Sequence, residues 1–260
     1  MKLHDNGYIY ASGNIPFDLN IGSSTFGKYF ESNSLNLKTE AELSDLPFLS
    51  PYITDLDSAD GNYKFMLNVE GPIKNLRRDG YILIQDGVFY TQLLNDPIRF
   101  INGKAQLINN KLNIENLSAD LNIENRKNGG RKIPNTQIRG EISLNKFFNP
   151  HYNLKLESKN ASFRLLFLDI YGETNLDLSI FGRDTVYIAG KIEPEEVNVF
   201  YEFATEDIGT AIVEDQNTIM SYNLNIPFRN RAFFQNSQID AEITGELNLS
   251  QIGFQEVDFG

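Results

Sequence analysis

The chain of 260 residues contains no cysteine and no tryptophan, and only two histidines. The absence of cysteine excludes a disulfide framework and any metal site built from thiolates. His4 lies near the N-terminus and His151 follows Asn149 and Pro150 at a predicted turn, so neither has the neighbours of a Ser-His-Asp triad or a histidine metal site. We therefore expect a protein that is not an enzyme, with no catalytic residues, no cofactor and no metal.

Positive charge is also scarce, because 23 Lys and Arg residues stand against 35 Asp and Glu residues and give a net charge of −12. Binding of nucleic acid requires a basic surface against the phosphates, so we expect no nucleic-acid partner. The N-terminal residues lack the apolar core of a secretion signal. The longest apolar run, residues 165–168, is far shorter than the roughly 20 residues of a membrane-spanning helix. We interpret the chain as an interior piece of a larger protein.

What the sequence does contain is a strict alternation of apolar and polar residues that recurs after glycines. Alternation with a period of two places successive side chains on opposite faces of a β-strand, and helical periods are nearly absent. The sequence therefore predicts an all-β chain of about fifteen short strands, several of them led by a glycine. Tight turns are expected at Asp86-Gly87, Asn102-Gly103 and Asn109-Asn110. The glycines that open the clearest segments are Gly61, Gly80, Gly103, Gly140, Gly172 and Gly245.

The apolar residues of these strands predict one apolar face on a long, meandering and mostly antiparallel sheet, curved into an open hydrophobic trough shaped like a taco. A closed core is the alternative, because amphipathic strands commonly belong to one. We expect a single elongated unit over residues 1–260, with a short helix within 35–50 as an alternative for the segment that contains Leu43, Leu46 and Leu49. The candidate lining residues are Tyr63, Phe65, Leu67, Val69, Ile142, Leu144, Leu154, Leu156, Leu176, Leu178, Ile239, Ala241, Ile243, Leu247 and Leu249.

Two clusters of acidic residues are candidates for a metal site or a catalytic site. Asp55, Asp57 and Asp60 precede Gly61, but their spacing does not match a Ca²⁺ loop of the EF-hand type, and a solvated turn is favoured. Glu193 and its neighbours at 195 and 196 flank a proline and indicate a charged strand end rather than the opposed carboxylates of a glycosidase.

Several segments resemble, in order, the TamB-like (translocation and assembly module) and AsmA-like family of the bacterial envelope. Residues 13–19 read Gly-Asn-Ile-Pro-Phe-Asp-Leu, like an opening found in that family. Residues 69–73 read Val-Glu-Gly-Pro-Ile, and residues 79–83 read Asp-Gly-Tyr-Ile-Leu. Residues 239–249 alternate without a break and resemble the lead-in to the conserved C-terminal region of the family.

The resemblance implies a non-enzymatic periplasmic conduit or chaperone that acts in outer-membrane protein assembly and secretion, in phospholipid transfer between the inner and outer membranes, or in both. Its implied partners are lipid acyl chains or unfolded outer-membrane protein strands. It also implies a parent protein anchored in the inner membrane of a diderm bacterium, with an outer-membrane barrel partner bound through a region beyond this chain's C-terminus. The alternative is a secreted β-sandwich or β-helix that binds carbohydrate or forms a stalk. An exposed row of aromatic residues would favour that alternative, but Phe and Tyr mostly take positions on the apolar face in the predicted strands.

Overall fold

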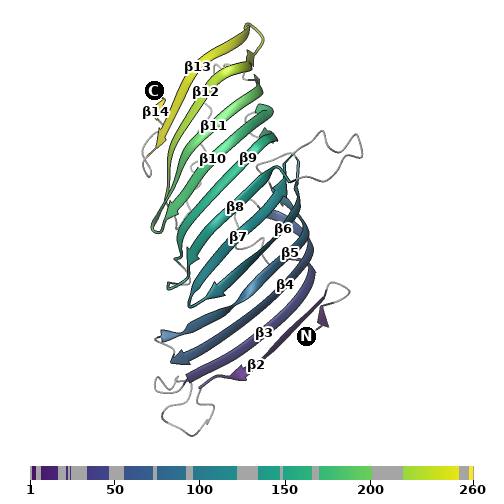
Figure 1. The fold of residues 1–260 in the computed structure, drawn as a ribbon, viewed down its shortest axis with the longest axis vertical. Coiled ribbons are helices and arrows are strands. Elements are labelled where there is room, and N and C mark those ends of the chain that lie inside the picture. Colours follow the sequence, from purple (N-terminus) through teal and green to yellow (C-terminus); the bar gives the residue numbers. More distant parts are fainter. Residues whose placement is uncertain are drawn as a thin grey trace.

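The computed structural model describes residues 2–3, 7–16, 22, 24, 34–46, 56–72, 75–91, 96–121, 134–146, 149–165, 170–200, 219–251 and 258–259. Within these residues the chain forms a single sheet of 14 strands that lie side by side in sequence order, from β1 to β14 (Figure 1). The N-terminal and C-terminal strands lie at opposite ends of a long, twisted sheet (Figure 1).

The strands are β1 (Lys2–Leu3), β2 (Gly7–Asn14), β3 (Ser34–Asp45), β4 (Leu56–Pro72), β5 (Arg77–Thr91), β6 (Ile98–Ile108), β7 (Lys111–Asp120), β8 (Thr136–Ser143), β9 (His151–Leu165), β10 (Ile170–Gly182), β11 (Thr185–Phe200), β12 (Ile219–Gln235), β13 (Asp240–Gln251) and β14 (Asp258–Phe259). All neighbouring strands are antiparallel except β11 and β12, which are parallel. The prediction of an all-β, mostly antiparallel sheet is confirmed.

Several local predictions were wrong, because the strands are longer than the sequence indicated. The described part of the proposed helical segment, up to Leu46, holds strand β3 and no helix. Asp86-Gly87 and Asn102-Gly103 lie inside β5 and β6 rather than in hairpin turns. Of these three predicted turns, Asn109-Asn110 is confirmed, and its residues have positive φ angles of 51° and 65°. The glycines likewise lie within strands, as Gly140 does in β8, and do not open them.

The two wrongly predicted turns are β-bulges, and bulges recur across most of the sheet. From β3 to β13, the pairing register shifts between all neighbouring strands except β8 and β9. A bulge adds a residue to one strand, bends that strand and increases its twist. Asp86, Phe100 and Asn160 lie beside such shifts and have positive φ angles between 48° and 51°.

Asparagine side chains bind the backbone groups that these bulges release from the strand ladder. The N–H of Asp86 donates to Asn102 Oδ1 at 3.0 Å, and the N–H of Asn160 donates to Asn175 Oδ1 at 2.9 Å. Asn135 Nδ2 donates to the carbonyl oxygen of Asn160 at 3.1 Å. These amides therefore give the released backbone groups a hydrogen-bond partner at the bulges.

Candidate functional site

The cross-strand register places apolar residues opposite one another from β2 to β13. Ile9 in β2 is opposite Ala41 in β3, and Leu156 in β9 is opposite Leu178 in β10. Across the parallel pair, Gly190 is opposite Leu224, which in turn is opposite Leu249 in β13. Since paired residues point to the same side of a sheet, these pairs define one continuous face, which we name the apolar face.

The predicted lining residues that lie within strands all belong to the apolar face. Tyr63–Ile84, Ile142–Tyr152 and the pairs of Ala241 and Leu247 follow the same register. Leu144 and Ile239 lie just outside the strands, one residue after β8 and one residue before β13. That these residues bind a ligand stays a prediction.

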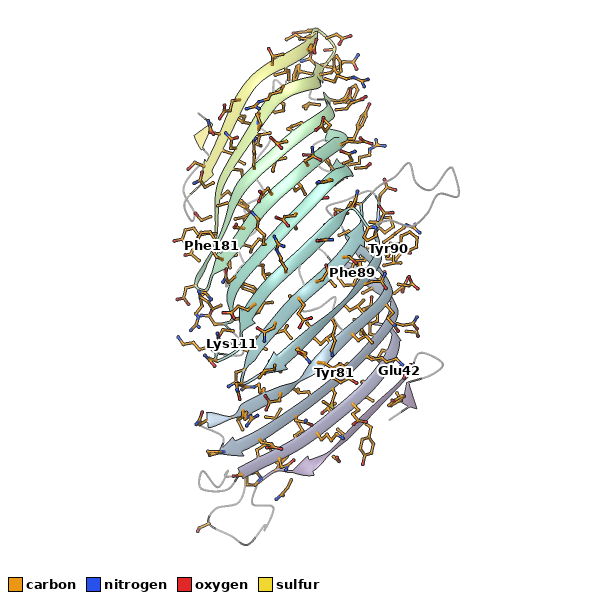
Figure 2. All side chains as sticks on the ribbon, in the orientation of Figure 1. Glu42, Tyr81, Phe89, Tyr90, Lys111 and Phe181 are labelled. Carbon is orange, nitrogen blue, oxygen red and sulfur yellow. The ribbon has the colours of Figure 1, made fainter. Side chains whose placement is uncertain are left out.

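Much of the apolar face is only partly buried. Ile82 is 41% exposed, whereas Leu43 and Tyr63 on the same face are each only 2% exposed. The described strands belong to one sheet, and their side chains project from its two faces (Figure 2). Apolar area of this face therefore remains accessible in the part of the chain that the structure describes.

The best-buried residues of the apolar face lie near the bulges and are often small. Ala161 is 2% exposed and is opposite Thr174, which is 4% exposed. Thr136 and Ser158 are both 4% exposed, and their hydroxyl groups hydrogen-bond to each other at 2.7 Å. These small buried side chains therefore lie where the pairing register shifts between neighbouring strands.

Tyr63 is the residue of the apolar face whose pKa is most clearly shifted. Its side chain is 2% exposed, and its hydroxyl group donates to the carbonyl oxygen of Asp60 at 2.7 Å. Burial, with the nearby Asp60 carboxylate as a second cause, raises the pKa of Tyr63 to about 12. The phenol is therefore neutral throughout the physiological range.

The opposite face is polar and carries salt bridges between strands. Lys64 pairs with Glu42 at 2.9 Å, and Arg139 pairs with Glu157 at 3.0 Å. The hydrogen bond and charge of Glu42 raise the pKa of Lys64. These pairs are well exposed, so each contributes little to stability.

Sequence reasoning missed a set of exposed aromatic residues on the polar face. Phe181 and Tyr187 are each 42% exposed and stack with ring centroids 5.3 Å apart. The sequence signal was adjacency to glycine, because the glycines at positions 7, 80, 172 and 182 all lie on the apolar face and their neighbours point the other way. The exposed aromatics directly beside these glycines are Tyr8, Tyr171 and Phe181, and Tyr10 and Tyr187 lie on the same polar face.

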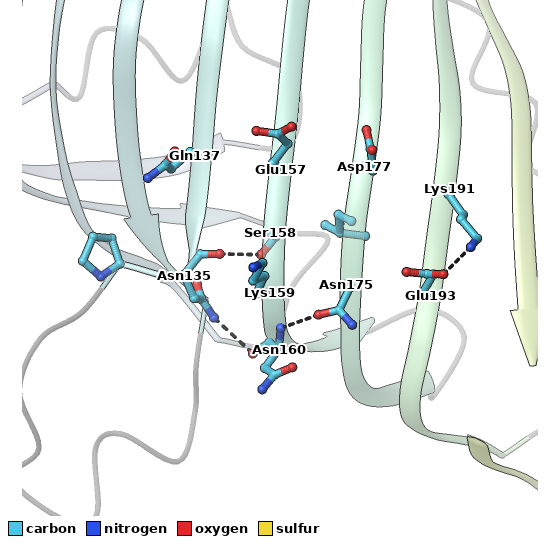
Figure 3. A pocket seen from close by; sticks show the side chains of 12 residues that line it. Asn135, Gln137, Glu157, Ser158, Lys159, Asn160, Asn175, Asp177, Lys191 and Glu193 are labelled. Atoms are coloured by element: carbon cyan, nitrogen blue, oxygen red, sulfur yellow. Dashed lines mark hydrogen bonds and ion pairs between the residues drawn. The ribbon is translucent and has the colours of Figure 1, made fainter. Parts of the chain in front are cut away.

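A cavity of about 1000 Å³ lies near the bulges of β9, β10 and β11. Figure 3 shows that polar side chains supply much of its lining, with Glu157 and Asp177 on neighbouring strands. Both carboxylates are already paired, Glu157 with Arg139 and Asp177 with Lys155. The described residues contain no group of three or more side chains suited to a metal ion.

The acidic residues after Lys191 also differ from their predicted setting. Glu193, Glu195 and Glu196 lie inside β11 rather than at a strand end. Lys191 pairs with Glu193, Arg231 pairs with Glu196 at 2.8 Å, and Asn175 donates to Glu195 at 2.7 Å. They act as ordinary polar-face residues.

Together these features define the chain as an all-β protein with a single described sheet, apolar on one face and charged on the other. Comparison with protein families, with curated proteins and with solved structures found no match. In the part of the chain that the structure describes, no helix has the length and apolar character needed to cross a membrane.

Proposed function

We propose that this chain is a segment of a TamB-type translocation and assembly module, a non-enzymatic protein whose apolar face carries lipid acyl chains between the inner and outer membranes. In this proposal the sheet curves around its apolar face as an open trough. The periplasmic location, the inner-membrane anchor of the parent protein and its outer-membrane barrel partner rest on the sequence resemblance alone.

The observation that carries the proposal is the continuity of the apolar face. From Ile9 to Leu249, each strand places apolar or small residues opposite those of the next. An acyl chain needs an unbroken apolar contact, because each buried CH₂ group contributes about 0.8 kcal/mol. A catalytic pocket needs a few converging polar groups instead, whereas most positions of the described part of this face are apolar or small.

The bulges support the curved shape. A row of bulges across many strands gives each strand a bend at a related place, which is how sheets acquire curvature. The buried small residues Ala161, Ser158 and Thr174 lie on the apolar side of these bends. Small residues are expected on the inner side of a bend, where there is least room.

Fatty-acid binding tests the proposal through two adjacent residues of β10. Leu178 belongs to the apolar face, whereas Ser179 belongs to the polar face, opposite Lys155. We expect Leu178→Asp to weaken binding of a fluorescent fatty acid by at least about tenfold, because an unpaired charge is costly in an apolar contact. Ser179→Asp is the matched control and should bind as the parent protein does, with circular dichroism confirming that both variants fold.

Equal binding by Leu178→Asp and the parent protein would contradict the proposal. An unfolded outer-membrane protein is the rival cargo, and it should be titrated in parallel. Binding of that chain by the parent protein, with no binding of fatty acid, would replace the acyl chain as the cargo.

Carbohydrate binding is the second candidate, and the stacked pair of Phe181 and Tyr187 on the polar face favours it. Aromatic rings exposed in this way suit the apolar faces of sugar rings. The chain has no tryptophan, so its intrinsic fluorescence comes from its 12 tyrosines, and comparison with Tyr187→Ala isolates the contribution of this surface. Quenching by soluble glycans that is lost in Tyr187→Ala would support this candidate, and unchanged fluorescence would exclude it.

A further inference from the structure

The outer edge of β13 is largely unpaired among the described residues. One side of β13 pairs with β12 from Asp240 to Gln251. The other side pairs only with the two residues of β14, through Leu249–Phe259 and Ser250–Asp258. The edge from residue 240 to residue 248 therefore presents backbone N–H and C=O groups without a described strand partner, a known template for pairing with another chain.

Among the described residues, the acidic side chains of β13 also lack the Lys and Arg partners that adjacent strands supply to acidic residues elsewhere in the sheet. Acidic residues on the polar face form salt bridges across to an adjacent strand, as Glu42 does with Lys64 and Glu141 with Lys111. In β13, Asp240 and Glu242 have no ion-pair partner in the described part of the chain. Glu246 accepts a hydrogen bond from the neutral amide of Asn225, which leaves its charge uncompensated.

We propose that the edge of β13 binds an extended segment whose residues alternate between apolar side chains and Lys or Arg. This segment adds to the sheet as an antiparallel strand and continues the ladder that β14 begins at Leu249 and Ser250. Its cations face Glu242 and Glu246, and its apolar side chains extend the face formed by Ile243 and Leu247. The proposal does not depend on lipid binding.

The charge of β13 selects the partner. A second copy of β13 would bring its own acidic residues against Asp240, Glu242 and Glu246, and like charges directly opposite each other destabilise a strand pair. A basic strand instead completes the cross-strand pairs seen between β3 and β4 and between β7 and β8. Backbone hydrogen bonds then provide affinity, and the alternating side chains provide specificity.

The apolar side of the edge has room for such a strand. Gly245 lies at the centre of the unpaired stretch, and a Cβ built on it would meet no atom within 4 Å. Ile243 and Leu247 flank it on the same face and are only partly buried.

Peptide binding to the full chain tests the proposal. The probe is a soluble synthetic peptide in which Val and Leu alternate with Lys and Arg, and its matched control carries Glu at each basic position. We expect the basic peptide to bind and the acidic peptide to bind at least about tenfold more weakly. The variant E242K/E246K should reverse this preference, because the charges of the edge are then reversed.

Amide hydrogen exchange identifies which residues bind the peptide, and it separates binding at this edge from an effect of the substitutions on folding. In an edge strand that pairs on one side only, every second backbone N–H group points away from the neighbouring strand. We expect every second amide between residues 240 and 248 to exchange fast in the free protein and to become protected with the basic peptide. A peptide preference that E242K/E246K leaves unchanged, protection elsewhere only, or self-association that protects the same amides without peptide would each overturn the proposal.

Discussion

Gly140 shows why single residues matter in a sheet of this kind. It lies within β8 with a φ of 135°, and a Cβ there would lie 2.2 Å from the carbonyl oxygen of Asn153 in β9. Two separate causes therefore exclude a side chain, an unfavourable backbone angle and the close approach of a neighbouring strand.

Gly140→Ala should lower the free energy of unfolding by at least about 2 kcal/mol, since a non-glycine residue at such an angle alone costs about 1–3 kcal/mol. Gly245 provides the control, because its φ is 148° and a Cβ there meets no atom within 4 Å. Urea denaturation should give a smaller loss for Gly245→Ala. Equal losses would show that the approach of Asn153 contributes nothing.

Tyr63 gives a prediction that depends on pH. Burial and Asp60 raise its pKa from 10.0 to about 12, so folding favours the neutral phenol. This contribution to stability is complete below about pH 10 and is lost as the pH rises through about 12. The difference in stability between the parent protein and Tyr63→Phe should therefore shift in favour of Tyr63→Phe between these pH values. Denaturation midpoints measured from pH 9 upward check this, and a difference independent of pH would contradict it.

At the scale of the strand, the alternation of apolar and polar residues predicted that the chain forms β-strands, but it did not predict how long the strands are. A break such as Gln85-Asp86-Gly87 is equally compatible with a hairpin and with a bulge. Pairing decides between them, because both halves of β5 pair with β4, through Ile84–Tyr63 and Phe89–Ala59, rather than with each other. These partners are distant in sequence, so local residue patterns cannot identify them.

The bends near the bulges predict a different tolerance for two alanines of the apolar face. Ala161 is 2% exposed and lies beside the register shift between β9 and β10, whereas Ala241 is exposed in β13. Ala161→Leu should lower the free energy of unfolding by about 1–3 kcal/mol through overpacking. Ala241→Leu should change it by no more than about 0.5 kcal/mol. Thermal or urea unfolding of both variants checks this, and a tolerated Ala161→Leu would mean that the bend leaves room on its apolar side.

At the scale of the molecule, the order of the strands follows the sequence, but one neighbouring pair has a direction that the residue pattern could not reveal. β11 and β12 are parallel, although the alternation within each strand fits either direction. The connecting residues 201–218 lie outside the described part of the chain. The apolar face nevertheless continues through this pair, because Ile188 is opposite Tyr222 and Gly190 is opposite Leu224.

The candidate site was predictable to a similar extent. The alternation identified the apolar face, because a period of two assigns residues to a face without any knowledge of pairing. It failed for the aromatics of the polar face, where Tyr8 and Tyr10 flank Ile9 and both faces of the strand are apolar. Only the register against Glu42 and Glu40 in β3 assigns these two tyrosines to the polar face.

The central claim is that acyl chains bind one face of this sheet, and crosslinking from adjacent residues tests it most directly. Leu156 lies on the apolar face of β9, and Glu157 lies next to it on the polar face. A photoreactive benzophenone side chain placed at each position in turn, in protein exposed to phospholipid vesicles and analysed by mass spectrometry, reports which face contacts lipid. The account predicts lipid adducts at position 156 and few at position 157. Adducts at 157 alone, at both positions equally or at neither would contradict it.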